Sequence, residues 1–139
     1  AYFGLKDYQQ VAVVSDMASQ LHPNIAITTC ATKREEDGLA MSSRNRFLSQ
    51  SSRTSALLLP SALYRAVSLW NSGATNAQDL IASITNSLSQ DPAVKVQYIS
   101  IVRNGTMEDV QTAGENDVIL AAIVVDGIRL IDNMPLISA

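Results

Sequence analysis

Two polar segments of the chain carry residue types that suit the binding of phosphate groups. The first is Phe3-Gly4-Leu5-Lys6-Asp7-Tyr8-Gln9-Gln10, at an expected helix start. A glycine there lets the backbone approach a ligand, and the free N–H groups of a helix start favour an anion. Lys6 adds a mobile point charge, and Gln10 in the first turn can point toward the same ligand. The same residues also fit a solvated helix start with Asp7 as its cap.

The second segment places two hydroxyls beside a guanidinium. It reads Lys33-Arg34-Glu35-Glu36-Asp37-Gly38-Leu39-Ala40-Met41-Ser42-Ser43-Arg44-Asn45-Arg46. Ser42, Ser43 and Arg44 can make several hydrogen bonds to one polyphosphate, and Arg offers a bidentate geometry that Lys lacks. A polar linker whose serines cap the next helix also fits this pattern.

The remaining reactive side chains do not form a catalytic set. The single histidine, His22, precedes a proline, where we expect a helix end and no metal site. The single cysteine, Cys30, lies in an apolar, Thr-rich run, and we expect a buried structural thiol. Asp126 is expected in a turn. The chain has neither a Walker-type phosphate loop nor a GxGxxG motif.

The first phosphate-binding candidate precedes a predicted helix over residues 8–21, in which apolar residues recur at helical spacing. A proline ends this helix, and residues 25–30 predict a short buried strand. Helix followed by strand is typical of a parallel α/β unit. The second candidate lies in a long polar loop over residues 31–49, and we place a domain boundary near its start.

Two further helices are predicted after this loop. The apolar face of the first runs from Ala56 to Trp70, and Pro60 indicates either a kink or a helix start nearby. Asn71-Ser72-Gly73 ends it. The second begins at an Asn76 cap with Asp79 in its first turn, and Asp91-Pro92 stops it. Its apolar face contains Ala77, Leu80, Ile84 and Leu88.

The rest of the chain predicts β structure. In residues 94–101, Val94, Val96, Tyr98 and Ser100 alternate with Lys95, Gln97, Ile99 and Ile101. An apolar run over residues 118–125 is separated from residues 128–131 by Asp126-Gly127, a strong signal for a two-residue hairpin. Two helices on a mainly antiparallel sheet predict a small α+β domain.

Composition narrows the class of protein. Apolar residues make up 47% of the chain and charged residues 17%, which is typical of a folded globular protein. The net charge is −3 and the bases are scattered, which argues against nucleic acid as a partner but leaves a nucleotide open. No apolar run is long enough to span a membrane, and we expect no membrane partner. A lone cysteine fits a reducing cytosol. The start lacks Met and signal-peptide features, so we expect a chain cut from something longer.

The two polar segments together resemble motifs of the pantothenate synthetase family, the pantoate–β-alanine ligases. Residues 3–10 resemble the family's FGEKDYQQ, and residues 34–49 resemble its REPDGLAMSSRNRYLS block. Near the end, Arg129-Leu130-Ile131-Asp132-Asn133 resembles RLIDN. The motifs stand in the family's order and spacing, and the similarity runs along essentially the whole chain.

The resemblance implies a fold and a reaction. The fold would be an α/β remnant of a Rossmann-like nucleotidylyltransferase domain at residues 1–32, followed by a small α+β C-terminal lid domain at residues 33–139. The reaction would join pantoate to β-alanine with ATP and Mg²⁺, through a pantoyl adenylate. The Ser-Ser-Arg segment would correspond to the KMSKS loop of class I aminoacyl-tRNA synthetases. A cytoplasmic homodimer is implied as well.

The resemblance also assigns residues, all by carry-over. Lys6, Ser42, Ser43 and Arg44 would bind the phosphates and stabilise developing charge. Gly4 and Asp7 would contact the ribose, and Lys33 and Met41 the adenine. Gln10 would bind pantoate, and no protein side chain is assigned as a metal ligand.

The sequence departs from the family pattern in a few places. Leu5 replaces a usual Glu, Lys33 stands where an apolar residue is common, and Pro60 is unexpected. The family's HIGH-like motif and N-terminal half are not in this sequence, so we expect the chain alone to be inactive. Two alternatives stay open: another adenylate-forming transferase with the same loop, and a non-catalytic binding or assembly module with the same fold.

Overall fold

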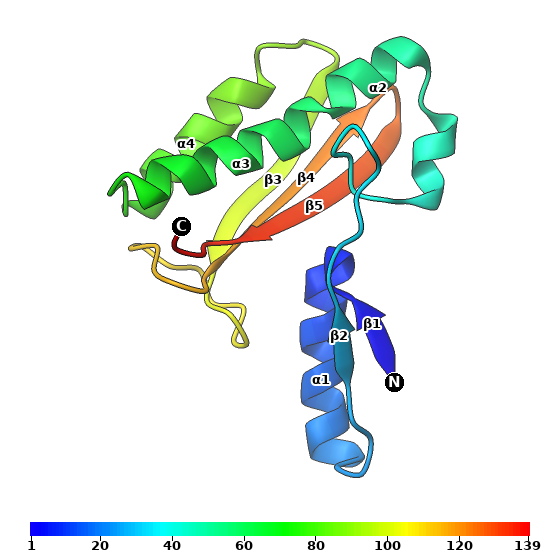
Figure 1. Ribbon diagram of the computed structural model, residues 1–139, viewed down its shortest axis with the longest axis vertical. Coiled ribbons are helices and arrows are strands. Elements are labelled where there is room, and N and C mark those ends of the chain that lie inside the picture. The colour runs from blue at the N-terminus through cyan, green and yellow to red at the C-terminus, as the bar shows by residue number, and fades with distance from the viewer.

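The computed structural model describes all 139 residues and divides into a larger and a smaller lobe (Figure 1). In the larger lobe, helices cover one face of a three-stranded antiparallel sheet with the order β3-β4-β5. The smaller lobe, at the N-terminal end of the chain, projects from the other side of this sheet. This arrangement confirms the predicted fold class, an α/β unit followed by an α+β unit.

The smaller lobe is a β-α-β unit. Its elements are β1 (Tyr2–Gly4), the 3-10 helix η1 (Leu5–Asp7), α1 (Tyr8–Leu21) and β2 (Thr28–Cys30). β1 pairs in parallel with β2, and the predicted helix over residues 8–21 is confirmed. Asp7 occupies the N-cap position, but its side chain accepts no capping hydrogen bond.

The prediction of a buried strand and a buried Cys30 was wrong. The strand begins at Thr28, its three residues are exposed, and the Cys30 thiol is exposed. In this structure β2 has only β1 as a neighbour, so no second strand or core covers its side chains. The apolar run over residues 25–30 would be buried as a strand only if further strands and helices covered both of its faces.

The polar loop ends at residue 49, as predicted, but it contains a short helix. The 3-10 helix η2 (Ser43–Phe47) follows a turn, and α2 (Gln50–Ala56) already begins at Gln50 with Ser49 as its cap. α3 (Leu58–Asn71) follows after a break at Leu57. Pro60 is the third residue of α3, in the first turn, where its missing N–H has no intrahelical partner to lose. The helix therefore starts near Pro60, as one of the two predicted alternatives stated.

α4 (Ala77–Leu88) matches its prediction in both cap and face. The Asn76 side chain accepts from the Asp79 backbone N–H at 3.1 Å. Its predicted apolar residues are all fully or nearly fully buried against α3 and the sheet: Ala77, Leu80, Ile84 and Leu88.

The sheet contains β3 (Val94–Val102), β4 (Val118–Val125) and β5 (Ile128–Pro135). The predicted hairpin is confirmed, with φ +51° at Asp126 and φ +74° at Gly127, as a type I′ turn requires. In β3 the predicted alternation fails after Gln97, because the register shifts between Val96 and Tyr98. A β-bulge there adds one residue and reverses the faces of all that follow.

The bulge decides which side chains of β3 face the smaller lobe. Ile99 and Ile101 join Val94 and Val96 against the helices, and Tyr98 moves to the opposite face, where it packs near Tyr8 of α1. The main core of 20 buried residues begins at Leu39, whereas only Val11 and Ala18 are buried in the first 32 residues. No helix is long and apolar enough to cross a membrane.

Candidate functional site

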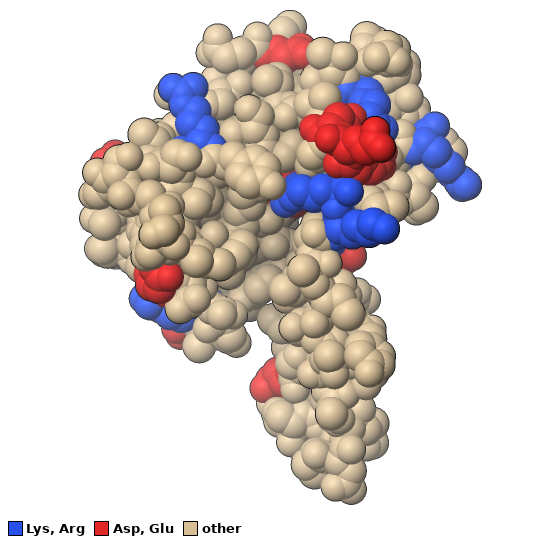
Figure 2. Space-filling view, in the orientation of Figure 1, with Lys and Arg blue, Asp and Glu red and all other residues tan.

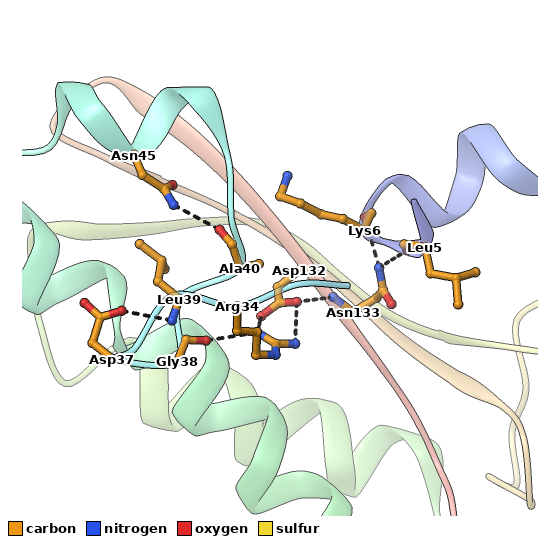
Figure 3. Close-up of polar contacts among 10 residues, drawn as sticks. All are labelled: Leu5, Lys6, Arg34, Asp37, Gly38, Leu39, Ala40, Asn45, Asp132 and Asn133. Carbon is orange, nitrogen blue, oxygen red and sulfur yellow. Dashed lines mark hydrogen bonds and ion pairs between the residues drawn. The ribbon is translucent and has the colours of Figure 1, made fainter. Parts of the chain in front are cut away.

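Asn133 of β5 holds the first candidate segment. Its amide Nδ2 donates to the backbone carbonyls of Leu5 at 2.8 Å and Lys6 at 3.0 Å, 128 and 127 residues away in sequence (Figure 3). Both donor hydrogens of the amide are used, and the residue is buried. Asn133 therefore fixes η1, from which the Lys6 side chain extends along β5.

The neighbouring Asp132 holds the second candidate segment. Its carboxylate makes a bidentate ion pair with Arg34, at 2.7 Å to Nη1 and 2.9 Å to Nη2, and its side chain is only 1% exposed. This carboxylate also raises the pKa of Arg34 by accepting its hydrogen bonds. Arg34 donates in addition to the carbonyl of Gly38 at 3.1 Å, and its guanidinium lies 5.7 Å from the Tyr64 ring centroid. One end of β5 thus anchors both segments.

The second segment is braced internally as well. Arg53 of α2 pairs with Glu35 at 2.6 Å and Asp37 at 2.7 Å, and Asn45 donates to Glu35 Oε1 and to the Ala40 carbonyl. Charged side chains of both signs gather over this part of the visible surface (Figure 2). The Asn45 hydrogen bond and then Arg53 lower the pKa of Glu35, and Arg53 lowers the pKa of Asp37.

The Ser-Ser-Arg residues lie at the start of η2, on the surface. Ser42 is the N-cap and accepts from the backbone N–H of Arg44 at 3.2 Å, so at least this hydroxyl takes the capping role left open by the sequence. Ser43 and Arg44 are exposed, and Arg44 Nη1 reaches the carbonyl of Arg129 at 3.4 Å. The backbone of the turn joins Met41 N to Lys33 O at 2.9 Å, which places these two predicted adenine residues side by side.

The first segment opens onto a cavity of about 210 Å³ against β5. Lys6, Asp7 and Gln10 line it, together with Arg129 and Asn133. Gly4 does not line this cavity; its φ of −77° is open to any residue, and nothing lies within 4 Å of the position that a Cβ would take. The backbone at Gly4 is therefore accessible to a ligand but does not require glycine for its conformation.

Sequence reasoning assigned no role to Arg34, Asp132 or Asn133. Their partners lie 98 or more residues away, and no local pattern predicts such a pairing. A signal existed in the two adjacent polar residues near the end of the last strand, because buried polar groups need partners. No group of three or more His, Cys, Asp or Glu side chains could hold a metal ion.

Known proteins are similar to almost the whole of this chain. The family model for pantoate-beta-alanine ligase matches residues 1–135. The chain belongs to the pantoate–β-alanine ligase family. Pantothenate synthetases of this family from Clostridium botulinum (strain 657 / Type Ba4) and Acetivibrio thermocellus are 41% and 40% identical to it, each over 96% of the chain.

Solved structures of pantoate–β-alanine ligases agree with the fold. The crystal structure of pantothenate synthetase from Thermus thermophilus matches 99% of this chain with a TM-score of 0.92 and 33% identity. A Francisella tularensis ligase complexed with β-γ ATP and β-alanine matches 97% with a TM-score of 0.65 and 28% identity. The chain spans about half the length of the relatives that it matches, 47% and 48% of the two bacterial synthetases and 49% of the Thermus chain.

Proposed function

We propose that the full-length protein ligates pantoate to β-alanine at the expense of ATP, and that this chain supplies its phosphate-binding segments. The observation that carries the proposal is the anchoring of both segments on one end of β5, by Asn133 and Asp132. Two segments that each present a cation, Lys6 and Arg44, are held on one rigid strand and so form a preorganised site for a polyphosphate. The Francisella relative, named as a complex with β-γ ATP and β-alanine, supports the same substrates.

Different residues of the site bind the phosphates, the ribose, the adenine and pantoate. Lys6, Ser42, Ser43 and Arg44 bind the phosphates as charged or hydroxyl donors. Gly4 and Asp7 contact the ribose, where the open space at Gly4 permits close approach. Met41 and Lys33, joined by their backbone hydrogen bond, face the adenine. Gln10, on the cavity next to Lys6, binds pantoate.

The reaction follows in two steps. A carboxylate oxygen of pantoate attacks the α-phosphorus, the bond to the bridging oxygen breaks, and pyrophosphate leaves. The cations stabilise the charge that accumulates on this leaving group. The amine of β-alanine then attacks the acyl carbon, loses a proton to solvent and expels AMP. Mg²⁺ would accompany the phosphates of ATP and neutralise part of their charge.

The proposal includes a second half of the full-length protein, which this chain does not contain. Residues 1–32 belong with a Rossmann-like nucleotide-binding domain, and residues 33–139 form the lid that closes over ATP. The HIGH-like motif and most of the pantoate pocket would come from the other half. We expect the full-length protein to be a cytoplasmic homodimer.

The test is formation of pantothenate from pantoate, β-alanine and ATP by the protein encoded in the complete reading frame. The expected products are AMP and pyrophosphate in equal amounts with pantothenate, and trapped pantoyl adenylate when β-alanine is omitted. The 139-residue chain, assayed beside it, should show neither product. Absence of both from the full-length protein would favour a non-catalytic module with this fold.

A further inference from the structure

We propose that Arg129 is a further phosphate-binding residue, which acts with Lys6 and Arg44 on the triphosphate and on departing pyrophosphate. The inference rests on the proposed function, because it adds a residue to the same site. Arg129 comes from β5, Lys6 from η1 and Arg44 from η2, so three elements would each contribute one cation.

The three cations lie around one part of the molecule. Arg129 and Lys6 line the same cavity of about 210 Å³. Arg44 reaches this place from the other segment, because its Nη1 lies 3.4 Å from the backbone carbonyl of Arg129. A ligand in the cavity beside Lys6 is therefore next to the strand position that Arg44 touches.

None of these three cations has a carboxylate partner. The four ion pairs of the structure use Arg34, Arg53 and Arg103 instead. Two carboxylates line the cavity, Asp7 and Asp132, and the second is already neutralised by Arg34. In a chain of net charge −3, two unpaired cations at one cavity, Lys6 and Arg129, with Arg44 in contact with the backbone of Arg129, indicate an anionic ligand.

The Arg129 side chain is oriented, and its outer end stays free. Its Nε donates to Gln97 Oε1 at 2.6 Å, across the intervening strand β4. Gln97 lies on this face of the sheet because it follows Val96, which faces the main core, and the β-bulge begins only at Gln97. No hydrogen bond occupies the terminal guanidinium nitrogens, so they remain available for bidentate contact with a phosphate.

The chemistry favours phosphates over the pantoate carboxylate. A single carboxylate needs one cation, whereas a triphosphate or pyrophosphate carries several negative charges. Arg129 should therefore affect ligands that contain the β- and γ-phosphates and leave AMP almost unaffected.

The experiment is a calorimetric titration of the full-length protein with inorganic pyrophosphate and, separately, with AMP. We expect Arg129→Ala to weaken pyrophosphate binding by about 10- to 100-fold, the range for a lost hydrogen-bonded charge contact, with AMP binding changed less than about twofold. The matched control is Arg65→Ala on α3, which removes an exposed, unpaired arginine from the helix side of the sheet. It should bind both ligands like wild type.

Two further variants distinguish the charge of Arg129 from the position of its guanidinium. Arg129→Lys keeps the positive charge but loses the bidentate guanidinium. Gln97→Leu keeps the arginine but removes the hydrogen bond that orients it. Both variants should have a pyrophosphate affinity between those of wild type and Arg129→Ala. Wild-type pyrophosphate affinity in Arg129→Ala, or equal losses in Arg129→Ala and Arg65→Ala, would overturn the assignment. Absence of pantothenate synthesis by wild type would instead overturn the proposed function, and the titration would still report on Arg129.

Discussion

Asn133 has no spare donor, since its two amide hydrogens go to the carbonyls of Leu5 and Lys6. These bonds are the direct connection between β5 and the segment that carries Lys6. The residue is buried, so water does not readily replace a lost partner. Its consequence for function is positional: the amide holds the backbone from which the Lys6 ammonium extends.

We predict that Asn133→Asp displaces Lys6. A carboxylate would face two carbonyl oxygens, which repel it, where the amide donated to both. Adenylate formation in the full-length protein should fall about 10- to 100-fold, because a shift of about 1 Å in a positioned group can cost that much. Single-turnover kinetics measure it, with Asn86→Ala on the exposed face of α4 as control. Unchanged kinetics in Asn133→Asp would show that η1 is positioned without this amide.

Arg44 is predicted to matter more in the transition state than in the bound state. Its guanidinium is exposed and makes one long contact, to the Arg129 carbonyl, so it is free to follow the leaving pyrophosphate. Arg44→Ala should lower the rate of adenylation by about 10²–10³-fold, as for loss of one preorganised donor, and weaken ATP binding less. Lys6→Ala should behave similarly.

Leu5→Ala is the control for this pair, because an alkyl group cannot stabilise a phosphate. Its adenylation rate should stay close to that of wild type in the same single-turnover assay. Near-normal turnover by Arg44→Ala would mean that the segment is a linker whose Ser42 caps η2, without a role as a phosphate clamp.

At the scale of elements, local patterns predicted much of what positions the site. The helix over residues 8–21 followed from apolar spacing, and the helix over residues 77–88 from apolar spacing and its Asn76 cap. The Asp126-Gly127 hairpin followed from its turn chemistry. These features depend on neighbours in sequence. The faces of β3 beyond Gln97 did not follow, because a bulge depends on pairing with β4. Burial of Cys30 failed for a similar reason, since it depends on strands outside the pair β1-β2.

In the candidate site, too, local features could be predicted from the sequence and long-range contacts could not. The residue types at Lys6 and at Ser42–Arg44 suited phosphate binding from sequence alone, and this role stays a prediction. The Arg34–Asp132 ion pair, between residues 98 positions apart, could not be inferred, because nothing local distinguishes that arginine from Arg46. What the structure adds is therefore the anchoring of the segments, while the chemistry of their side chains was already visible.

The second segment should lose its brace in acid. The folded-state pKa values of Asp37 and Glu35 are both lowered, Asp37 chiefly by Arg53 and Glu35 chiefly by Asn45. A carboxyl with a lowered pKa stabilises the fold fully above its unfolded pKa, about 3.9 for Asp and 4.3 for Glu, and this contribution is lost as pH falls through the folded value. The brace should therefore weaken below about pH 4.

Asp37→Asn tests this pH dependence. The variant should melt at a lower temperature than wild type at about pH 7, because it lacks the charge that pairs with Arg53. The gap should begin to shrink below about pH 4 and go on shrinking as pH falls through the lowered folded pKa of Asp37, because the wild-type carboxyl then loses the charge that pairs with Arg53. Melting curves from about pH 7 to about pH 3 measure it, and a constant gap over this range would contradict the assignment.

The whole molecule consists of two lobes with unequal cores. Apart from Val11 and Ala18, every buried apolar residue lies at Leu39 or beyond. In α1, Val13, Met17 and Leu21 remain exposed, at 67%, 48% and 66%. The polar contacts between the lobes are few: the Asn133 amide to η1, and the Tyr8 hydroxyl to Asn104 Oδ1. A cavity of about 540 Å³ separates α1 from the sheet along the rest of the junction.

This imbalance predicts two separate stabilities within the 139-residue chain. Backbone amides exchange with solvent through local opening, whose free energy grows with the apolar surface that closing buries. The strand amides within residues 94–131 should exchange slowest, because they are hydrogen-bonded in a sheet that covers most of the core. Those of residues 8–30 should exchange much faster, since α1 buries two side chains and β2 pairs with a single strand.

Hydrogen exchange read by mass spectrometry distinguishes the two regions in one sample. The full-length protein is the matched comparison, because a wider sheet and a second half of the site would cover β1, β2 and the exposed apolar residues of α1. Protection over residues 8–30 should rise in it, while protection over residues 94–131 should change little. Stronger protection of residues 8–30 than of 94–131 in the isolated chain would show that the smaller lobe is stable by itself, and the division near residue 32 would lose its physical basis.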